Sequence, residues 1–472
     1  MKRYRFVRRG LVRVLLALAA LAPACAVGPD YRRPALDLPD KFRGLPETGA
    51  AGESASLWPW WEIFNDADLQ ALLRAALADN YDLRIAISRV EQARQQLAQA
   101  RAGYFPSLNY SGLAGRGRNA FLLSSPAPTA TTTDFFALSA NVSWEIDLWG
   151  RIRRLNEAAL AQFLASEDAR RDVTVSIVAE VAQSYFQLLT LDRQLRIAVE
   201  SRDSFTSSLK LFQQLLTGGV ASKLETSSAE ALLDAAAASI PDFERRIAAQ
   251  ENGLCFLVGR VPGPIARREP TLDEIRHAAI PAGLPSTLLE RRPDIRNAEQ
   301  QLRAANAQVG VAQADFFPRL DLTGLFGVIS SQLSSLFSGG AVAWSAGANL
   351  TGPIFQGGQI RARYRQAWAV REQMALHYRQ VVLNALQEVA TQLVARQKLA
   401  EARALQEQAV EAYREAVKTA LQRFRLGTAA YFEVLQEQQQ LFPAETNLAQ
   451  LQLEEHLALV QLYRALGGGW SY

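Results

Sequence analysis

Histidine is scarce in this chain, and its scarcity bears on catalysis and on metal binding. Among 472 residues there are three histidines, His277, His377 and His456. They lie far apart in the sequence, and no cysteine or carboxylate cluster stands near them at metal-ligand spacing. The sequence also lacks a nucleophile elbow and a phosphate-binding loop. We therefore expect no enzyme activity and no metal site.

Apolar runs long enough to cross a membrane are also lacking near the N-terminus. The apolar run there covers residues 14–21, whereas a bilayer-spanning helix needs about 20 apolar residues. Six basic residues precede this run: Lys2, Arg3, Arg5, Arg8, Arg9 and Arg13. A basic front followed by a short apolar run is typical of a secretory signal peptide, which we assign to residues 1–24.

Cysteine occurs twice, and the first copy follows the signal. The string Leu21-Ala22-Pro23-Ala24-Cys25 resembles a bacterial lipobox, although Ala22 stands where that motif prefers leucine. We predict a covalent lipid (palmitate) on Cys25 and no other cofactor; the alternative is an ordinary signal with a cysteine nearby. Ala26 is not the aspartate that retains lipoproteins at the inner membrane of enteric bacteria, which implies outer-membrane delivery. Cys255 lies in an apolar run and is predicted to be buried, without an internal disulfide.

A charge excess is absent once the signal is removed. The chain has 51 basic and 47 acidic residues, and six basic residues leave with the signal. The remaining balance is 45 minus 47, or −2. The sequence pI of about 9.1 is therefore no sign of nucleic-acid binding.

Proline and glycine are missing from two long stretches, residues 151–217 and 359–425. Each has apolar residues at helical spacing and predicts a helix roughly 100 Å long, as in a coiled coil or a helical bundle. Breaks at residues 217–222 and 426–430 follow, and a shorter helix returns after each break. A further helical pattern runs from about residue 66 to residue 103.

Four stretches alternate between apolar and polar residues with period two and predict strands. They lie at about residues 107–117, 135–147, 319–329 and 342–354. In the second stretch one face is apolar, with Leu138, Ala140, Val142, Trp144 and Ile146, and the other carries Ser139, Asn141, Ser143, Glu145 and Asp147. Each such strand therefore has one apolar and one polar side.

The two halves of the chain repeat one another. Asp82-Leu83-Arg84 recurs 212 positions later as Asp294-Ile295-Arg296, and Gly219 with Glu225 recurs 208 positions later as Gly427 with Glu433. We divide the chain into a signal, an extended lipidated arm, two repeats with a connector between them, and a tail: 1–24, 25–65, 66–259, 260–285, 286–467 and 468–472. We predict a fold that is mainly α with a membrane β-barrel part, built from a duplicated helix–strand–strand–long helix–helix unit.

Four strands cannot form a closed barrel alone. Open sheet edges are excluded from hydrocarbon, so closure of a membrane barrel requires strands from more than one chain. The polar strand faces would then line a wet lumen. The alternative is a small soluble β-layer with one solvated face.

Several strings resemble one family of membrane proteins. They are Val27-Gly28-Pro29-Asp30-Tyr31-Arg32-Arg33-Pro34, Trp60-Trp61 with Phe64, Trp144-Glu145-Ile146-Asp147-Leu148-Trp149-Gly150-Arg151 and Leu289-Glu290-Arg291-Arg292-Pro293-Asp294-Ile295. Together they resemble the TolC-like outer membrane factors of tripartite efflux pumps, in the lipoprotein (NodT-type, OprM-like) branch. The resemblance covers essentially the whole chain after the signal.

The resemblance implies a homotrimer anchored in the outer membrane and extending into the periplasm. Three chains would form a 12-stranded barrel and a 12-helix tunnel. The implied partners are a periplasmic adaptor and a proton-driven (RND-type) inner-membrane transporter, and the function is a passive exit duct for drugs or other small toxic compounds. Two alternatives stay open: the exit duct of a type I protein secretion system, and a non-conducting coiled-coil envelope lipoprotein.

The resemblance also places functional residues at the two helical breaks. It implies a periplasmic gate near Phe424, Phe432, Glu433 and Gln436, where three copies of Glu433 would form a ring of negative charge. Gln436 departs from the usual aspartate, and Phe432 fits either an apolar pore ring or packing between helices. The implied adaptor-facing tips are Gly219, Val220, Ala221, Gly427, Thr428 and Ala429. Pro443, inside the last helix, is predicted to kink it.

Overall fold

The structure, a computed structural model, describes residues 26–44, 66–118, 132–267 and 285–468. The predicted signal peptide, Cys25, Trp60-Trp61, most of the connector and most of the tail lie outside the described residues. By its internal contacts the chain divides into two units. Unit 1 comprises residues 1–35, 90–166 and 298–378, and unit 2 comprises residues 36–89, 167–297 and 379–472.

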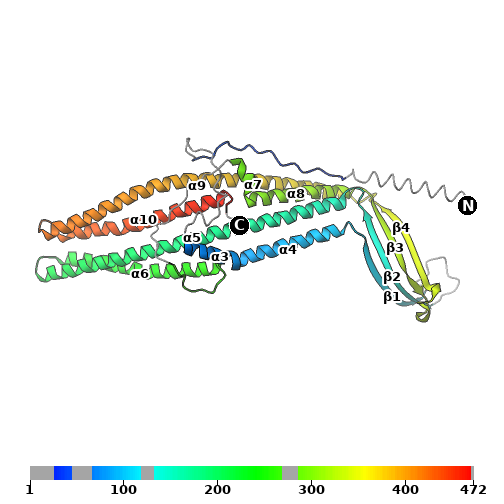
Figure 1. The fold of residues 1–472 in the computed structure, drawn as a ribbon, viewed down its shortest axis with the longest axis horizontal. Helices are drawn as coiled ribbons and strands as arrows, with labels where there is room; N and C mark the ends of the chain where they lie inside the picture. Colours follow the sequence, from blue (N-terminus) through cyan, green and yellow to red (C-terminus); the bar gives the residue numbers. More distant parts are fainter. Residues whose placement is uncertain (1–25, 45–65, 119–131, 268–284, 469–472) are drawn as a thin grey trace. The chain divides into compact units, whose positions relative to one another are not determined.

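Both halves of the chain run through the same order of elements (Figure 1). The first half contains α3 (Ala67–Asp79), α4 (Tyr81–Ala102), β1 (Ser107–Arg118), β2 (Thr132–Ile146), α5 (Arg151–Thr217) and α6 (Lys223–Leu257). The second half contains α7 (Leu288–Arg291), α8 (Pro293–Ala314), β3 (Arg319–Ser330), β4 (Val342–Thr351), α9 (Gln359–Arg425) and α10 (Tyr431–Ala465). The long helices match in length, with 67 residues in both α5 and α9, and so do the returning helices, with 35 in both α6 and α10. The short first helices differ, with 13 residues in α3 and 4 in α7.

The helix expected between residues 66 and 103 is interrupted. Asn80 separates α3 from α4 with an extended ψ of 129°. Its side-chain oxygen accepts a hydrogen bond of 3.1 Å from the Leu83 N–H, and its amide nitrogen donates one of 2.8 Å to the Leu257 carbonyl. An asparagine side chain that competes for backbone groups in this way ends one helix and begins the next.

The two halves use corresponding residues to join their shorter helices. Asn80, at the start of α4, binds the carbonyl of Leu257, the last residue of α6. Arg292, 212 positions after Asn80, donates a 2.8 Å hydrogen bond to the carbonyl of Ala465, the last residue of α10. In unit 2 the end of each returning helix therefore meets the start of the helix that leads to the strands.

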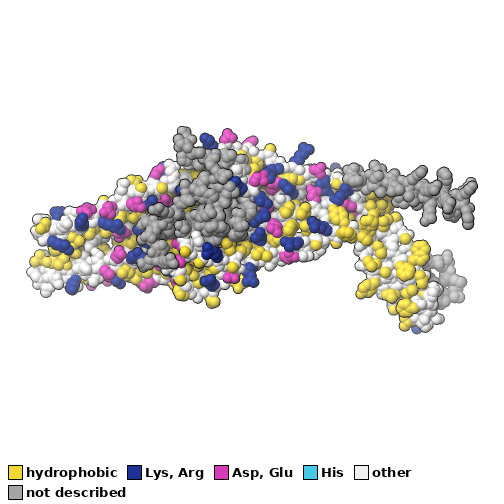
Figure 2. All heavy atoms as spheres, viewed as in Figure 1, with side chains coloured by type: hydrophobic (Ala, Val, Ile, Leu, Met, Phe, Trp, Pro, Cys, Tyr) yellow, Lys and Arg dark blue, Asp and Glu magenta, His cyan; other side chains and the backbone are white. Residues whose placement is uncertain are grey.

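Unit 1 contains a four-stranded antiparallel sheet in the order β1-β2-β3-β4. One row across it pairs Tyr110 with Ala140, Ala140 with Phe326 and Phe326 with Trp344. These side chains share the apolar face, where Tyr110 is 88% and Trp344 is 73% exposed in the single chain. The strand surface visible in Figure 2 is accordingly rich in hydrophobic side chains, whereas charged side chains are spread over the helices.

The other face of the sheet is polar. Ser111 and Ser139 are hydrogen-bonded through their hydroxyls at 2.9 Å, and the Asn141 amide donates to Ser111 at 3.2 Å. The last strand is shorter than the alternation predicted, because β4 ends at Thr351 and is followed by Gly352-Pro353. Proline has no backbone N–H to continue the ladder.

No helix in the described ranges has both the length and the apolar character needed to cross a bilayer.

Candidate functional site

The candidate site is formed by two hairpin ends of unit 2. The first tip consists of the turn at residues 218–222 and the adjoining helical turns of α5 and α6. The second tip consists of the turn at residues 426–430 and the adjoining helical turns of α9 and α10. Gly219 and Gly427 have φ values of 76° and 71°. Nothing lies within 4 Å of a Cβ built on either residue, so backbone conformation rather than space accounts for these glycines. The sequence-predicted tip residues therefore lie in the two turns.

A shared hydrophobic cluster holds the helices of both tips together. It contains Phe205, Phe212, Ala229, Ala236, Ala420, Tyr431, Val434 and Leu435. The Tyr431 ring packs edge-on against Phe212 and Phe424, at centroid distances of 5.2 and 4.9 Å. Its hydroxyl lies 2.9 Å from the Ser208 hydroxyl, which is buried on α5. Phe424, a predicted gate residue, thus packs against the core of the tips within this chain.

The two corresponding acids of the tips have different partners. In the first tip Ser222 caps α6, and the Glu225 carboxylate accepts 2.7 and 2.9 Å hydrogen bonds from the Ser222 backbone N–H and hydroxyl. These bonds hold the pKa of the Glu225 carboxyl below its usual value. In the second tip Ala430 offers no side-chain cap, and the Glu433 carboxylate instead lies 2.8 Å from Arg423 Nη1.

The pairing with Arg423 changes the expected electrostatics of Glu433. Within each chain the guanidinium offsets the carboxylate, and both side chains are about half exposed, at 52% and 45%. A ring of three uncompensated Glu433 charges would therefore require this pair to separate. This partner of Glu433 could have been found by comparing the two halves of the sequence. Arg423 stands where the first half has Leu215, so the basic residue is specific to the second half.

The remaining predicted gate residues lie on the first turns of α10. Phe432 is 46% exposed in the single chain, and Gln436 is exposed one turn further along. Two apolar tip residues that sequence reasoning missed, Leu224 and Leu426, are 76% and 78% exposed, like Val220 at 78%.

The difference between the tips can be tested by giving α10 the serine cap that α6 already has. Ala430→Ser is expected to stabilise the start of α10 by about 1 kcal/mol, because the hydroxyl can accept from the N–H groups of its first turn. Hydrogen exchange of residues 431–434 should slow by roughly fivefold, and Ser222→Ala should speed exchange at the start of α6 by a similar factor. Ala429→Ser, one position before the cap, is the matched control and should change neither. Equal protection of α10 in both serine variants would contradict the cap explanation.

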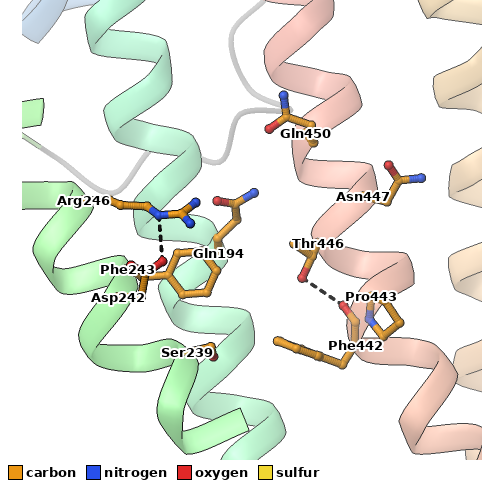
Figure 3. A pocket seen from close by; sticks show the side chains of 10 residues that line it. All are labelled: Gln194, Ser239, Asp242, Phe243, Arg246, Phe442, Pro443, Thr446, Asn447 and Gln450. Carbon is orange, nitrogen blue, oxygen red and sulfur yellow. Dashed lines mark hydrogen bonds and ion pairs between the residues drawn. The ribbon is translucent and has the colours of Figure 1, made fainter. Parts of the chain in front are cut away.

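A groove of about 580 Å³ lies between α5, α6 and α10 of unit 2 (Figure 3). Phe243 on α6 and Phe442 on α10 line it together with Gln194 from α5. Pro443, for which the sequence predicted a kink, also lines it, and α10 continues through this proline. A proline in a helix leaves a carbonyl one turn earlier without its N–H partner. For Pro443 that carbonyl belongs to Gln439, whereas the Thr446 hydroxyl donates a 3.0 Å bond to the Phe442 carbonyl.

The described part of the chain offers no group of three or more His, Cys, Asp or Glu side chains arranged to hold a metal ion. His456, one of the three histidines, is buried and stacks on Phe186 at 4.9 Å. Cys255 is also buried and is not in a disulfide.

Comparisons with known proteins agree with this architecture. A model of the family "Outer membrane efflux protein" matches residues 72–260 and 284–468. The solvent efflux pump outer membrane protein SrpC of Pseudomonas putida is 35% identical over 452 residues, covering 95% of this chain and 96% of the relative. The cation efflux system protein CusC of Escherichia coli is 32% identical over 456 residues, covering 96% and 98%.

A solved structure gives the same result for the fold. The outer-membrane channel OprN superposes with a TM-score of 0.86 at 34% identity, covering 94% of this chain and 100% of that structure. The matched regions include the strands, the long helices and both tips described above. The chain therefore belongs to the outer membrane efflux protein family, and its function is that of the outer-membrane channel of an efflux pump.

Proposed function

We propose that three copies of this chain form the passive exit duct of a tripartite pump, with a 12-stranded barrel and a 12-helix periplasmic tunnel. The four-stranded sheet carries this proposal. Its apolar face is exposed, and its edge strands β1 and β4 each have one neighbouring strand within the described chain. Because unpaired backbone is excluded from hydrocarbon, the edges of one copy pair with those of the next.

The proposed partners are a periplasmic adaptor and an RND-type inner-membrane transporter. The first tip offers Val220 and Leu224, and the second tip offers Leu426, as exposed apolar contacts. Together with Gly219, Ala221, Gly427, Thr428 and Ala429 they form the proposed adaptor-facing surface. At the second tip Phe424, Phe432, Glu433 and Gln436 form the proposed gate, with Arg423 as the partner of Glu433.

The proposed cargo consists of drugs or other small toxic compounds. The names of similar relatives include both a solvent efflux protein and a cation efflux protein. Comparable identity to both supports a duct whose cargo is chosen by the pump to which it is attached. We also propose a covalent lipid on Cys25 as the outer-membrane anchor.

Planar-bilayer recording of the purified chain tests this function. We expect discrete channel currents from a cross-linkable trimer, with low conductance in the closed state. If the protein is a monomer in detergent and gives no current, even when substitutions are made to open the tips, the result would favour a non-conducting lipoprotein. Reconstitution with an RND pump and its adaptor should restore drug efflux, whereas restoration only with an ATP-driven exporter and a protein substrate would favour the secretion duct.

A further inference from the structure

Residues 26–33, here called the arm segment, lie against α5 and α8 in unit 1. The Val27 N–H donates to the Trp149 carbonyl at 3.0 Å, just before α5 begins. The Asn306 amide of α8 donates to the Pro29 carbonyl at 2.7 Å, and its side-chain oxygen accepts a 2.9 Å bond from Arg371 of α9. Backbone groups of the arm segment are thus held by side chains from helices far away in the sequence.

Two glycines allow the arm segment to approach α8 closely. Gly28 has a φ of 102°, and a Cβ built on it would lie 2.4 Å from the Gly310 Cα. A Cβ on Gly310 would in turn lie 2.8 Å from the Arg154 side chain. No side chain larger than hydrogen fits either position without displacement of the arm segment or of Arg154.

The arm segment supplies most of the hydrogen-bond acceptors for a buried cation. The Arg154 side chain on α5 is 6% exposed. It donates to the Val27 and Gly28 carbonyls at 3.2 Å and to the Asp30 carboxylate at 2.9 Å, while Glu157 provides the fourth acceptor at 2.7 Å. Without the arm segment the Arg154 guanidinium would lose three of these four acceptors. The buried charge on α5 therefore favours the bound position of the arm segment.

A buried carboxylate holds the other end of the arm segment. Glu299 of α8 is 4% exposed and accepts hydrogen bonds from Arg33 at 2.7 and 3.1 Å, from the Tyr31 hydroxyl at 3.1 Å and from Arg303 at 2.8 Å. Burial opposes its charge, but hydrogen bonds from Arg33 and Arg303 prevail and lower the pKa of Glu299. Burial and then the Glu299 charge raise the pKa of Tyr31 to about 12, so its hydroxyl stays a donor.

We propose that α5 and α8 form a docking site for an extended peptide that carries an acidic residue three positions before a basic one. The arm segment is the ligand of this site, and the bound arm segment acts as a latch that holds the N-terminus. Asp30 and Arg33 are the two charges, met by Arg154 and Glu299. The latch brings Ala26 against Gly150, where a Cβ would lie 2.7 Å from the Ala26 Cα. It therefore fixes the start of the arm next to the junction of β2 and α5.

The latch determines which helices take up a force applied to the N-terminus. In combination with the lipid proposed on Cys25, tension from the anchor would pass into α5 and α8. Release of the arm segment would instead leave an exposed linker between anchor and channel. This consequence depends on the proposed lipid, whereas the docking site does not.

Limited trypsin proteolysis of the purified full-length chain tests the latch at the Arg32–Arg33 bond, which lies between the anchored Tyr31 and the anchored Arg33. In the native protein we expect slow cleavage there, because a protease requires the segment to detach. Glu299→Gln and Arg33→Gln should each increase the cleavage rate about tenfold or more, since cleavage follows the population of the detached state. Arg33 is on the exposed side of the contact, so its variant does not depend on repacking of α8.

Two comparisons complete the experiment. Gln308→Ala, an exposed change on the same helix, is the control and should leave the rate unchanged. The double variant should be cleaved more slowly than the product of the two single effects predicts, because both substitutions remove the Arg33–Glu299 contact. Rates in both single variants within twofold of native, after correction for cleavage of the denatured chains, would overturn the latch. A faster-released fragment without a lipid mass would retain the latch and refute only the anchor.

Discussion

Arg423→Ala is expected to make the channel distinctly more cation-selective. The substitution removes the positive partner 2.8 Å from Glu433 and leaves one uncompensated carboxylate per chain at the second tip. In the proposed trimer three such charges around the proposed gate would concentrate cations, and the ratio of cation to anion permeability should rise by about tenfold. The reversal potential in asymmetric KCl measures this ratio directly.

Two further variants separate the ion pair from a general charge effect. Arg425→Ala removes a neighbouring exposed charge of the same sign and should shift selectivity much less. Arg423→Ala combined with Glu433→Gln should return the channel close to native selectivity. Stability is expected to change by no more than about 1 kcal/mol, because the pair is half exposed. Equal shifts from the two arginine variants would refute the specific role of the pair.

Among the substitutions considered, Arg292→Met is expected to lower the free energy of unfolding most. The Arg292 side chain is 9% exposed and binds Asp294 at 2.7 Å, Glu388 at 2.8 Å and the Ala465 carbonyl at 2.8 Å. Burial opposes its charge, but the two carboxylates prevail and raise the pKa of Arg292. Removal of the guanidinium leaves the buried Ala465 carbonyl without this donor and Asp294, which is 29% exposed, without its partner, at a cost of about 2–4 kcal/mol. Denaturant unfolding and the thermal dissociation of the proposed trimer should both show this loss.

The corresponding residue of the first half provides a matched comparison. Asn80→Ala removes a neutral donor to the Leu257 carbonyl and a cap of α4, with an expected cost of about 1–3 kcal/mol. A cost for Arg292→Met no larger than that for Asn80→Ala would show that the charged network contributes nothing beyond the carbonyl contact.

The types and lengths of the elements were accessible from the sequence because they depend on local rules. A stretch of 67 residues without proline or glycine forms α5, and a second one forms α9. Period-two alternation similarly marks β2, since successive side chains of a strand point to opposite faces. The motif resemblance led to the family, and the duplication suggested that the differences between the tips are where function is located.

Only the tertiary structure decided what the functional side chains contact. Glu225 and Glu433 are equivalent in sequence, yet one accepts from its own helix cap and the other from Arg423 across the turn. The latch joins Tyr31 to Glu299 over 268 positions, a separation at which local propensity carries no information. Sequence by itself therefore determined the repeated frame of helices and strands, because hydrogen bonding and periodicity act within a few residues. Which charges meet depended on chain packing, because the partners come together only when the helices do.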